Sequence, residues 1–503
     1  MIVQEKRRLE CHEFDDFLVT EVCLDQVSVN NNQLKFTYLI DGEPNSCSIR
    51  YNTVDFGHSP FKSEQEAKRF AVILAVLCSL RFGAVLPQKV NLQAYSSYID
   101  RELLDFLQVA MGGHWSQHRY QVGKLDYKTP KLLVDDLQLG KKATYPLWSI
   151  SKENSPVQVI LGCGSGKDSL LCSRILESAG VEYDIVTYFH DIYGDNSDQE
   201  NLFEQVTSHL KYCNRHGVYF NDEYYGWVQR RLQQTNIVAR TKDYFGKNRF
   251  RTEAGETLLT TVAMIPVQVA HSIPLLALGH EKSADAPNLV EPESGEDVSH
   301  QWTKSLTYHK AITEQMLRIF DGVNSVSLTK PIHDVKIFDL LFQLDPTLPY
   351  ATNSCNFQKP WCCRCEKCCY VFSGFAAFGN LDKTVEAFGN NLLDMPENLP
   401  LWSDLLGLNG YIAWECVGLP EETQLYFYKL YKQGVKGQAI ELFESEIIQP
   451  LQDKGESLDL YFSAIQDRCS QVYETHHTMP EWLWEKIKPV LLQHGSTIFS
   501  NED

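Results

Sequence analysis

Residues Val157–Ser169 read VQVILGCGSGKDS, a short apolar run that passes directly into a glycine-rich turn ending in Lys-Asp-Ser. The pattern predicts a buried strand followed by a loop. Gly164 and Gly166 have no Cβ, so the loop backbone can turn sharply and bring its N–H groups close to phosphate oxygens. The helical spacing of apolar residues after Asp168 predicts a helix whose positive N-terminal end faces the same place. Strand, loop and helix together predict an anion site, and we expect the anion to be a nucleotide.

Two common phosphate-binding loops do not fit this stretch. A P-loop has Lys followed by Ser or Thr, whereas Lys167 is followed by Asp168. A dinucleotide-binding loop needs a third glycine, which the run Gly162–Asp168 lacks at the usual offset. The alternative without a ligand is an ordinary strand-to-helix turn.

The stretch GSGKDS instead resembles the pyrophosphate-binding loop, or PP-loop, of enzymes that cleave ATP to AMP and pyrophosphate. These enzymes activate a carboxyl or carbonyl oxygen as an adenylate. The resemblance implies ATP as cofactor, with the nucleotide-binding residues Gly164, Ser165, Gly166, Lys167, Asp168 and Ser169.

Composition limits the classes of partner. The chain has 503 residues, a length that indicates two or three domains. Its formal net charge of −19 argues against sequence-independent binding of nucleic acid, which relies on clustered Lys and Arg. Residues 1–14 do not resemble a secretory signal, and the longest apolar run, residues 70–80, is too short to cross a bilayer. We therefore expect a cytoplasmic protein that binds neither nucleic acid nor membrane.

Six of the fifteen cysteines lie between residues 355 and 369. In a reducing compartment, such clustering indicates a metal site more readily than free or disulfide-bonded cysteines. Three of them follow a C-x-x-C-x-x-C spacing that presents thiolates on a tight turn, and an earlier cysteine can complete a tetrahedron. Four protein ligands leave no open position for water, so the predicted zinc is structural. The expected ligands are Cys355, Cys362, Cys365 and Cys368, while Cys363 and Cys369 offer other registers.

Two further polar segments carry candidate catalytic residues. Gly279–Ala284 follows a predicted strand, and ligands in open parallel sheets bind beyond the carboxyl ends of strands. Within it, Glu281 is a candidate to bind magnesium or a proton. In Ser299–Ser305, His300 is a candidate general acid or base and Lys304 a candidate cation. The alternative for each is an ordinary solvated loop residue.

Residues 1–145 are predicted to form an N-terminal α+β domain. Alternating apolar and polar residues at 34–40 and 46–51, with Asp41-Gly42 after the first run, predict a hairpin. Two segments with helical spacing and a polar, proline-containing linker complete this domain, at 63–82, 99–111 and 127–145 respectively.

From residue 146 onward, predicted strands alternate with helices, which is typical of a doubly wound parallel sheet. This second domain, 146–380, is expected to have the fold of PP-loop and adenine nucleotide α-hydrolase proteins and to contain the cysteine site. A mainly helical region, 381–503, is expected to follow. The predicted strands are 157–161, 183–188 and 275–278.

Seven motifs, in this order, resemble those of the UDP-N-acetylmuramoyl-L-alanyl-L-glutamate epimerases, the MurL family. They are Gly164–Ser169, Gly279–Ala284, Ser299–Ser305, Ser354–Asn356, Trp361–Phe372, Phe388–Asp394 and Glu415–Gly418. The resemblance also implies kinship with PP-loop enzymes of the 7-cyano-7-deazaguanine synthase type, whose cysteine site is similar. It implies an ATP- and magnesium-dependent inversion of the terminal L-glutamate of UDP-MurNAc-L-Ala-L-Glu, a peptidoglycan precursor of the cell wall.

The residues and the resemblance together predict an acyl-adenylate mechanism. The loop with Lys167 would hold the phosphates, and Asp168 would help to hold magnesium. Three residues are candidates for proton transfer: Glu281, His300 and Lys304. The expected partner is a small anionic UDP-linked molecule, while the oligomeric state is not predicted. Two other functions stay open: a PP-loop ligase that forms an amide or nitrile from the adenylate, and a non-catalytic nucleotide-binding regulatory protein.

Overall fold

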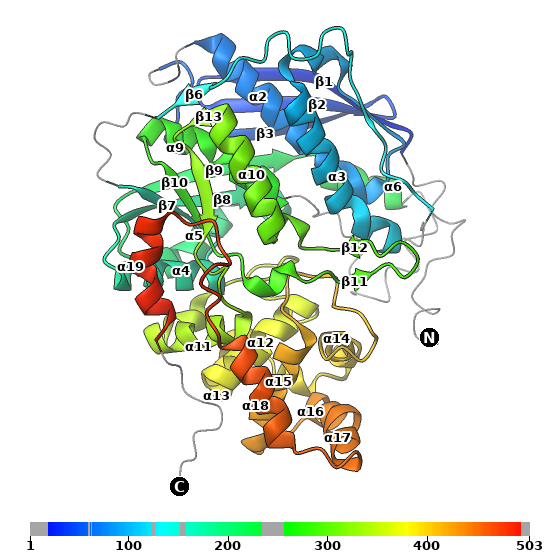
Figure 1. The fold of residues 1–503 in the computed structure, drawn as a ribbon, viewed down its shortest axis with the longest axis vertical. Coiled ribbons are helices and arrows are strands. Elements are labelled where there is room, and N and C mark those ends of the chain that lie inside the picture. Colours follow the sequence, from blue (N-terminus) through cyan, green and yellow to red (C-terminus); the bar gives the residue numbers. More distant parts are fainter. Residues whose placement is uncertain are drawn as a thin grey trace.

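The computed structural model describes residues 19–58, 61, 63–121, 126–150, 157–233 and 256–493 (Figure 1). The strands of its central sheet are β1 (Glu21–Asn30), β2 (Gln33–Ile40), β3 (Glu43–Tyr51), β4 (Lys89–Asn91), β5 (Leu132–Leu133), β7 (Val159–Gly162), β8 (Tyr183–His190), β9 (Arg215–Asp222), β10 (Leu275–Leu278) and β14 (Asn324–Ser327). They form one ten-stranded sheet in the order β14-β10-β7-β8-β9-β3-β2-β1-β4-β5. Parallel and antiparallel pairs both occur in it, and this mixed sheet with its many helices confirms the predicted α/β class.

Five strands make the parallel half of the sheet, and the strand order reverses at β7. β7 pairs with β8 on one side and with β10 on the other, and β9 and β14 extend the two sides. The carboxyl ends of β7 and β10 therefore meet where the order reverses, the place at which open α/β sheets bind ligands. The predicted strands are present as β7, β8 and β10, with β7 beginning two residues later than expected.

The predicted hairpin is present as β2 and β3. Its turn residues Asp41 and Gly42 have positive φ angles of 48° and 84°, as a tight hairpin turn requires. β3 then pairs antiparallel with β9, with Ile49 opposite Phe220. The N-terminal strands and the parallel strands thus belong to one continuous sheet, although the boundary predicted after residue 145 assigns them to different domains. The boundaries 1–145, 146–380 and 381–503 stay predictions.

Helices cover both faces of the parallel strands. Ile160 packs into one hydrophobic cluster, whereas its neighbours Val159 and Leu161 pack into another, because successive strand residues point to opposite faces. The first cluster includes residues of α2 (Glu64–Cys78), α3 (Arg101–Gln121), α8 (Glu256–Ala263), α9 (Ile265–His271) and α10 (Leu306–Ile319). The second includes residues of α4 (Lys167–Ser178), α5 (Asn196–Thr207), α11 (Asp334–Leu344) and α12 (Glu366–Phe378). Burial on both faces explains why these strands read as continuous apolar runs.

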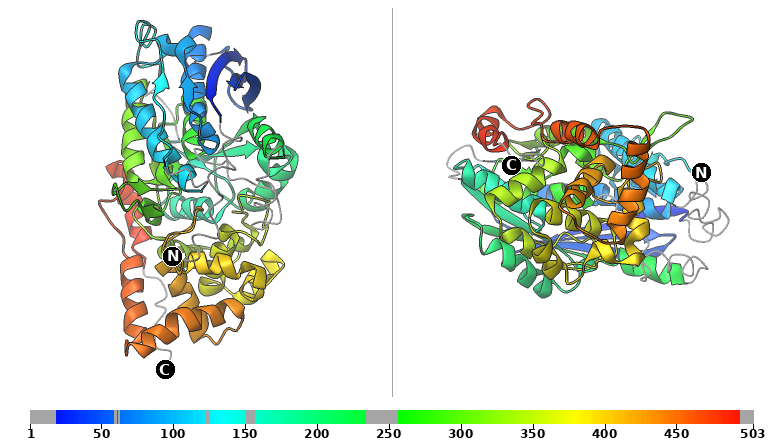
Figure 2. Two further views of the ribbon diagram at one scale, coloured as in Figure 1. Left: turned by 90° about the vertical axis from the view of Figure 1, so that its right-hand side faces the viewer. Right: turned by 90° about the horizontal axis from the view of Figure 1, so that it is seen from below.

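The C-terminal region is mainly helical, as predicted, and lies at one end of the molecule, away from β1–β3 (Figures 1 and 2). Its helices are α13 (Leu381–Phe388), α14 (Leu399–Leu405), α15 (Pro420–Lys432), α16 (Gln438–Phe443), α17 (Gln449–Asp453), α18 (Leu458–Cys469) and α19 (Glu481–Leu491). α19 returns to pack against α4. Among the described residues, no helix is both long and apolar enough to cross a membrane.

Candidate active site

The glycine-rich loop connects β7 to α4 and is braced from the C-terminal half of the chain. The Asn353 N–H donates to the Ser165 carbonyl at 3.0 Å, and a Cβ on Gly166 would lie 2.8 Å from Ser354 Oγ. Ser165 has a φ of 54°, a left-handed conformation that favours glycine. Gly164 is exposed, and a Cβ there would meet no atom within 4 Å. The loop is therefore fixed on one side and open to solvent at Gly164.

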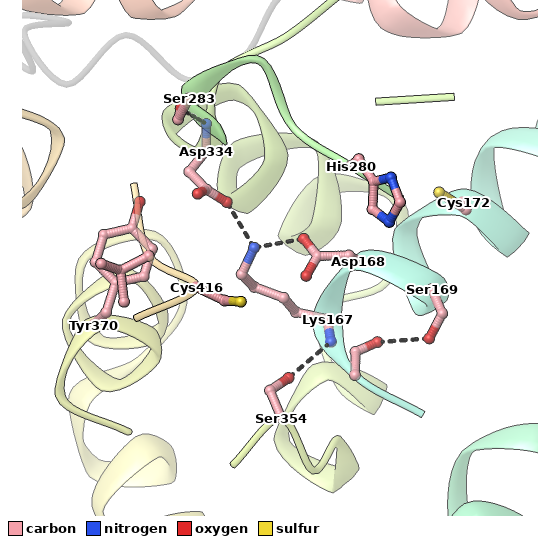
Figure 3. A network of polar contacts seen from close by, with 12 residues as sticks. Lys167, Asp168, Ser169, Cys172, His280, Ser283, Asp334, Ser354, Tyr370 and Cys416 are labelled. Atoms are coloured by element: carbon pink, nitrogen blue, oxygen red, sulfur yellow. Dashed lines mark hydrogen bonds and ion pairs between the residues drawn. The ribbon is translucent and has the colours of Figure 1, made fainter. Parts of the chain in front are cut away.

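Lys167, the first residue of α4, is 1% exposed and is held by two carboxylates (Figure 3). Its Nζ lies 2.5 Å from Asp168 Oδ1 and 2.6 Å from Asp334 Oδ1. Burial by itself would lower the pKa of Lys167, but Asp168, Asp334 and Glu281 outweigh it and raise this pKa. Lys167 thus places a permanent positive charge at the N-terminus of α4, the helix that follows the loop.

The two carboxylates that contact Lys167 differ in their surroundings. The Asp334 side chain is 2% exposed, and burial raises its pKa even though Lys167 opposes the shift. The Asp168 side chain is 25% exposed. A Cβ on Gly279 would lie 3.0 Å from Asp168 Cβ, so the segment after β10 packs directly on the first turn of α4. Asp168 is the carboxylate of this pair that an ion from solvent can reach.

Glu281 and Lys304 extend this charged group. Glu281 is buried, and burial would raise its pKa, but Lys304, Lys167 and Lys367 lower the pKa to about 2. Burial would likewise lower the pKa of Lys304, whereas Cys416 and Glu281 raise it. Both groups are therefore ionised at neutral pH. The structure brings Lys167, Asp168, Glu281 and Lys304 of the predicted residues into one electrostatic network.

His300 lies at the edge of this network and contacts two other parts of the chain. Its Nδ1 is 2.6 Å from Gln117 Oε1 on α3. Its Nε2 is 3.9 Å from both Cys416 Sγ and Glu415 Oε1.

Ser169, the last residue of the loop motif, donates a hydrogen bond from its hydroxyl to the Gly166 carbonyl at 3.1 Å. This bond stabilises the first turn of α4.

Sequence reasoning missed Asp334, Lys367 and Cys416 as members of the network. Asp334 begins α11 shortly after β14, so the rule that placed Gly279–Ala284 at a strand end could also have found it. Cys416 belongs to the motif Glu415–Gly418, which was noted without a role. Lys367 likewise belongs to the motif Trp361–Phe372, which was used for its cysteines alone, and α12 brings this lysine into the network.

The four cysteines selected from the sequence lie together. Cys355 Sγ is 4.0 Å from Cys365 Sγ, Cys362 Sγ is 3.8 Å from Cys368 Sγ, and all four sulfurs lie within 4.8 Å of one another. Four sulfurs at about 2.3 Å from a tetrahedral zinc stand roughly 3.8 Å apart. The group can therefore hold a metal ion.

Neighbouring groups fit a thiolate site in this cluster. Two backbone N–H groups, of Phe357 and Gln358, donate to Cys355 Sγ at 3.4 Å, as charged sulfurs need. The alternative register through Cys363 is disfavoured, because its Sγ lies 3.2 Å from the Phe388 carbonyl. Cys355 directly follows Ser354, so the cysteine cluster also fixes the residue that braces the glycine-rich loop.

The comparisons with known proteins agree on one family. The chain is 28% identical over 194 residues to the UDP-N-acetyl-alpha-D-muramoyl-L-alanyl-L-glutamate epimerase of Micromonospora sp., and 25% identical over 195 residues to the epimerase of the same name from Salinispora tropica. It is 23% identical over 426 residues to that of Xanthomonas oryzae pv. oryzae. The model of the MurL C-terminal domain matches residues 349–454. The chain is thus similar to proteins of the MurL family.

The extent of the likeness to MurL proteins differs between relatives. The first two matches cover 35% of this chain each, and only 41% and 40% of the length of the relatives. The match to the Xanthomonas protein covers 81% of this chain and 82% of that protein. The matched MurL C-terminal domain contains the cysteine cluster and Cys416. No solved structure matches the chain.

Proposed function

We propose that the chain is an ATP-dependent epimerase that inverts the terminal L-glutamate of UDP-MurNAc-L-Ala-L-Glu to D-glutamate through an acyl-adenylate. The observation that carries this proposal is the meeting of Lys167 and Asp168 with Glu281 and Lys304 at the carboxyl ends of β7 and β10. The relatives are UDP-N-acetyl-alpha-D-muramoyl-L-alanyl-L-glutamate epimerases by name, which supports this substrate. The proposal includes a PP-loop fold, a cytoplasmic location and a role in peptidoglycan biosynthesis.

Activation of the carboxyl group is what makes inversion feasible. Removal of the α-proton from a free carboxylate places two negative charges on one small unit. An acyl-adenylate has lost the carboxylate charge, and its carbonyl delocalises the electron pair of the carbanion. An enzyme for this reaction therefore needs a triphosphate site and a carboxylate site side by side, with charged groups that do not have to reorganise during the reaction.

The loop and α4 supply the triphosphate site in this proposal. The backbone N–H groups around Gly164 and Gly166, the positive end of α4 and the Lys167 ammonium would bind the phosphates. Asp168, the more exposed of the two carboxylates beside Lys167, would hold magnesium. A magnesium ion bound there would offset the negative charge of the departing pyrophosphate.

Lys304 and Glu281 form the part of the site that would bind the terminal carboxylate of the substrate. Lys304 is a cation beside the loop and would attract the terminal carboxylate of the substrate toward the α-phosphorus. Glu281 is ionised, and its charge raises the pKa of both Lys304 and Lys167, so it keeps the two cations protonated. Glu281 is therefore a positioning residue, which acts through the charges of Lys304 and Lys167. Its low pKa makes it a poor proton donor.

Zinc is proposed for the cysteine cluster, where it would have a structural role. Its four thiolate ligands, Cys355, Cys362, Cys365 and Cys368, leave no position open for a reacting water. The bound ion would hold Ser354 against Gly166 and Lys167 and thereby keep the loop in its conformation.

The proposal is tested by incubating the purified chain with ATP, magnesium and UDP-MurNAc-L-Ala-L-Glu in heavy water. We expect AMP and pyrophosphate to form and deuterium to appear at the glutamate α-carbon of a D-configured product. Incorporation of nitrogen from added ammonia, with unchanged configuration, would instead identify a ligase. Absence of AMP with this substrate and with other carboxylates would contradict both enzymatic functions and leave a regulatory nucleotide-binding protein.

A further inference from the structure

Cys416 is a partly exposed cysteine between two basic side chains. Its Sγ lies 3.9 Å from His300 Nε2, within hydrogen-bond distance for sulfur, and the Lys304 side chain forms a hydrogen bond with it. Several other cysteines outside the metal cluster pack among apolar residues, for example Cys172 on α4. Cys416 is thus a thiol with an acceptor on one side and a cation on the other.

His300 is oriented so that it can accept the thiol proton. Its Nδ1 lies 2.6 Å from Gln117 Oε1, and a carboxamide oxygen can only accept a hydrogen bond. Nδ1 therefore carries the hydrogen, and Nε2 faces Cys416 as an acceptor. The Glu415 carboxylate, 3.9 Å from the same Nε2, stabilises the imidazolium that results from proton transfer. Nucleophile, base and orienting group stand in the order known from enzymes that activate a thiol.

The backbone on both sides of Cys416 is fixed. The Lys367 ammonium donates to the Cys416 carbonyl at 2.5 Å, and the Cys416 N–H donates to Glu415 Oε1 at 3.0 Å. Gln301 Nε2 donates to the next carbonyl, that of Val417, at 2.9 Å. Cys416 lies outside any helix or strand, and these contacts hold its backbone in place. A reacting group requires such a fixed position.

The thiol also points toward the nucleotide loop. Figure 3 shows the Cys416 sulfur directed at the Lys167 side chain. Lys304, which contacts Cys416, also interacts with Glu281 and Asp168. A carboxyl group activated at the loop would therefore lie beside Cys416.

We propose that Cys416 is a catalytic residue of the epimerisation, and that its thiolate, formed by proton transfer to His300, removes the α-proton of the adenylated terminal glutamate. This inference rests on the proposed function. In the step, the Cα–H bond breaks, an S–H bond forms, and the electron pair enters the carbonyl group of the mixed anhydride. A proton derived from water adds to the opposite face of the α-carbon, so no group is oxidised or reduced.

A metal ion is the competing occupant of this place, since one ligand atom each from His300, Glu415 and Cys416 lie within 4.8 Å of one another. Two ammonium groups argue against it. Lys304 contacts the Cys416 side chain and Lys367 contacts its carbonyl, and both would repel a divalent cation at this distance. Proton transfer is the use of these residues that the surrounding charges favour.

The test compares Cys416→Ser with Cys213→Ser, a change at an exposed cysteine outside the site. We expect Cys416→Ser to keep substrate-dependent exchange of labelled pyrophosphate into ATP within about twofold, and to lose α-deuterium incorporation by a factor on the order of 10² or more. Cys213→Ser should keep both activities. Undiminished deuterium incorporation in Cys416→Ser overturns the inference, as does the loss of a metal ion additional to that of the cysteine cluster.

A measurement on the unchanged chain covers the case in which Cys416→Ser loses both activities. Alkylation by iodoacetamide, followed by mass spectrometry, should show Cys416 protected when UDP-MurNAc-L-Ala-L-Glu and a non-hydrolysable ATP analogue are both bound, with Cys213 labelled as before. Unprotected Cys416 overturns the inference. The proposed function fails separately, if the unchanged chain forms no AMP, and the role of Cys416 then fails with it.

Discussion

The ammonium of Lys167, at the first residue of α4, lies 2.6 Å from the carboxylate of Asp334, at the first residue of α11. Both side chains are almost fully buried, and the ring of Phe338 lies 5.0 Å beneath the ammonium. The pair connects the loop after β7 to the helix after β14. An ion pair in this position keeps a positive charge at the glycine-rich loop and fixes the first turn of α4 against α11.

Asp334→Asn should destabilise the chain, because it leaves a buried ammonium with Asp168 as its remaining carboxylate partner in direct contact. We expect the free energy of unfolding, measured by urea denaturation, to fall by up to about 3 kcal/mol. The matched control is Lys432→Met, which breaks the exposed pair with Asp459 and should change stability by less than about 1 kcal/mol. Equal effects of the two changes would contradict the importance assigned to burial.

Two adjacent glycines of α3 should respond in opposite directions to alanine. A Cβ on Gly113 would fall within the indole ring of Trp302, whereas a Cβ on Gly112 would meet no atom within 4 Å. Gly113→Ala should lower the free energy of unfolding by about 1–3 kcal/mol through overpacking. Gly112→Ala should raise it by about 0.5–1 kcal/mol, as expected for glycine inside a helix.

The same pair tests the link between α3 and the site. Trp302 begins the short helical turn that ends at Lys304, so displacement of its ring should also reduce AMP formation by Gly113→Ala. Gly112→Ala should keep wild-type AMP formation. A stable and fully active Gly113→Ala would show that the contact between α3 and Trp302 does not position Lys304.

The sequence predicted those features that arise from neighbouring residues. The loop at Gly164–Ser169, the β2–β3 hairpin and the four clustered cysteines each depend on short-range spacing, and the structure places them as expected. The pairing of β3 with β9 left no local signal, because an edge strand can accept many partners and its choice depends on the whole fold. The joining of the N-terminal strands to the parallel sheet could not be predicted for that reason.

The candidate site shows the same division. Lys167 and Asp168 stand in one motif and could be selected by their order. Gln117 comes from α3, 183 positions before His300, and Asp334 lies 167 positions beyond Lys167. Such residues become neighbours only through packing, and their types alone are those of ordinary polar surface positions.

Metal content should distinguish the four predicted ligands of the cysteine cluster from Cys363, a neighbouring cysteine outside the ligand set. Cys365→Ser removes a predicted ligand of the proposed zinc, and we expect metal analysis to show that this variant no longer binds the ion. We also expect a higher ATP concentration for half-maximal AMP formation, since Ser354 would no longer be held against the loop. The matched control is Cys363→Ser, whose sulfur lies 3.2 Å from the Phe388 carbonyl and should leave zinc in place. Equal zinc content in both variants would contradict the assigned ligand set.

Glu422 should make stability depend on pH in the direction opposite to that of a surface carboxylate. Burial, together with the nearby Asp334, raises the pKa of Glu422 from 4.5 to about 8 in the folded chain. The Glu422 carboxyl group accepts hydrogen bonds from the N–H groups of Leu419 at 2.7 Å and Val335 at 3.2 Å. Between these two pKa values the folded state binds more protons than the unfolded state, so this contribution to stability is complete below pH 4.5 and is lost as pH rises through 8. Glu422→Gln keeps the shape and one of the two acceptor oxygens, and it should flatten that part of the profile of unfolding free energy against pH. Glu421→Gln, at the neighbouring and more exposed position, should leave the pH dependence unchanged. A wild-type profile that rises from pH 5 to 8, with the same slope in Glu422→Gln, would show that Glu422 is ionised in the folded chain.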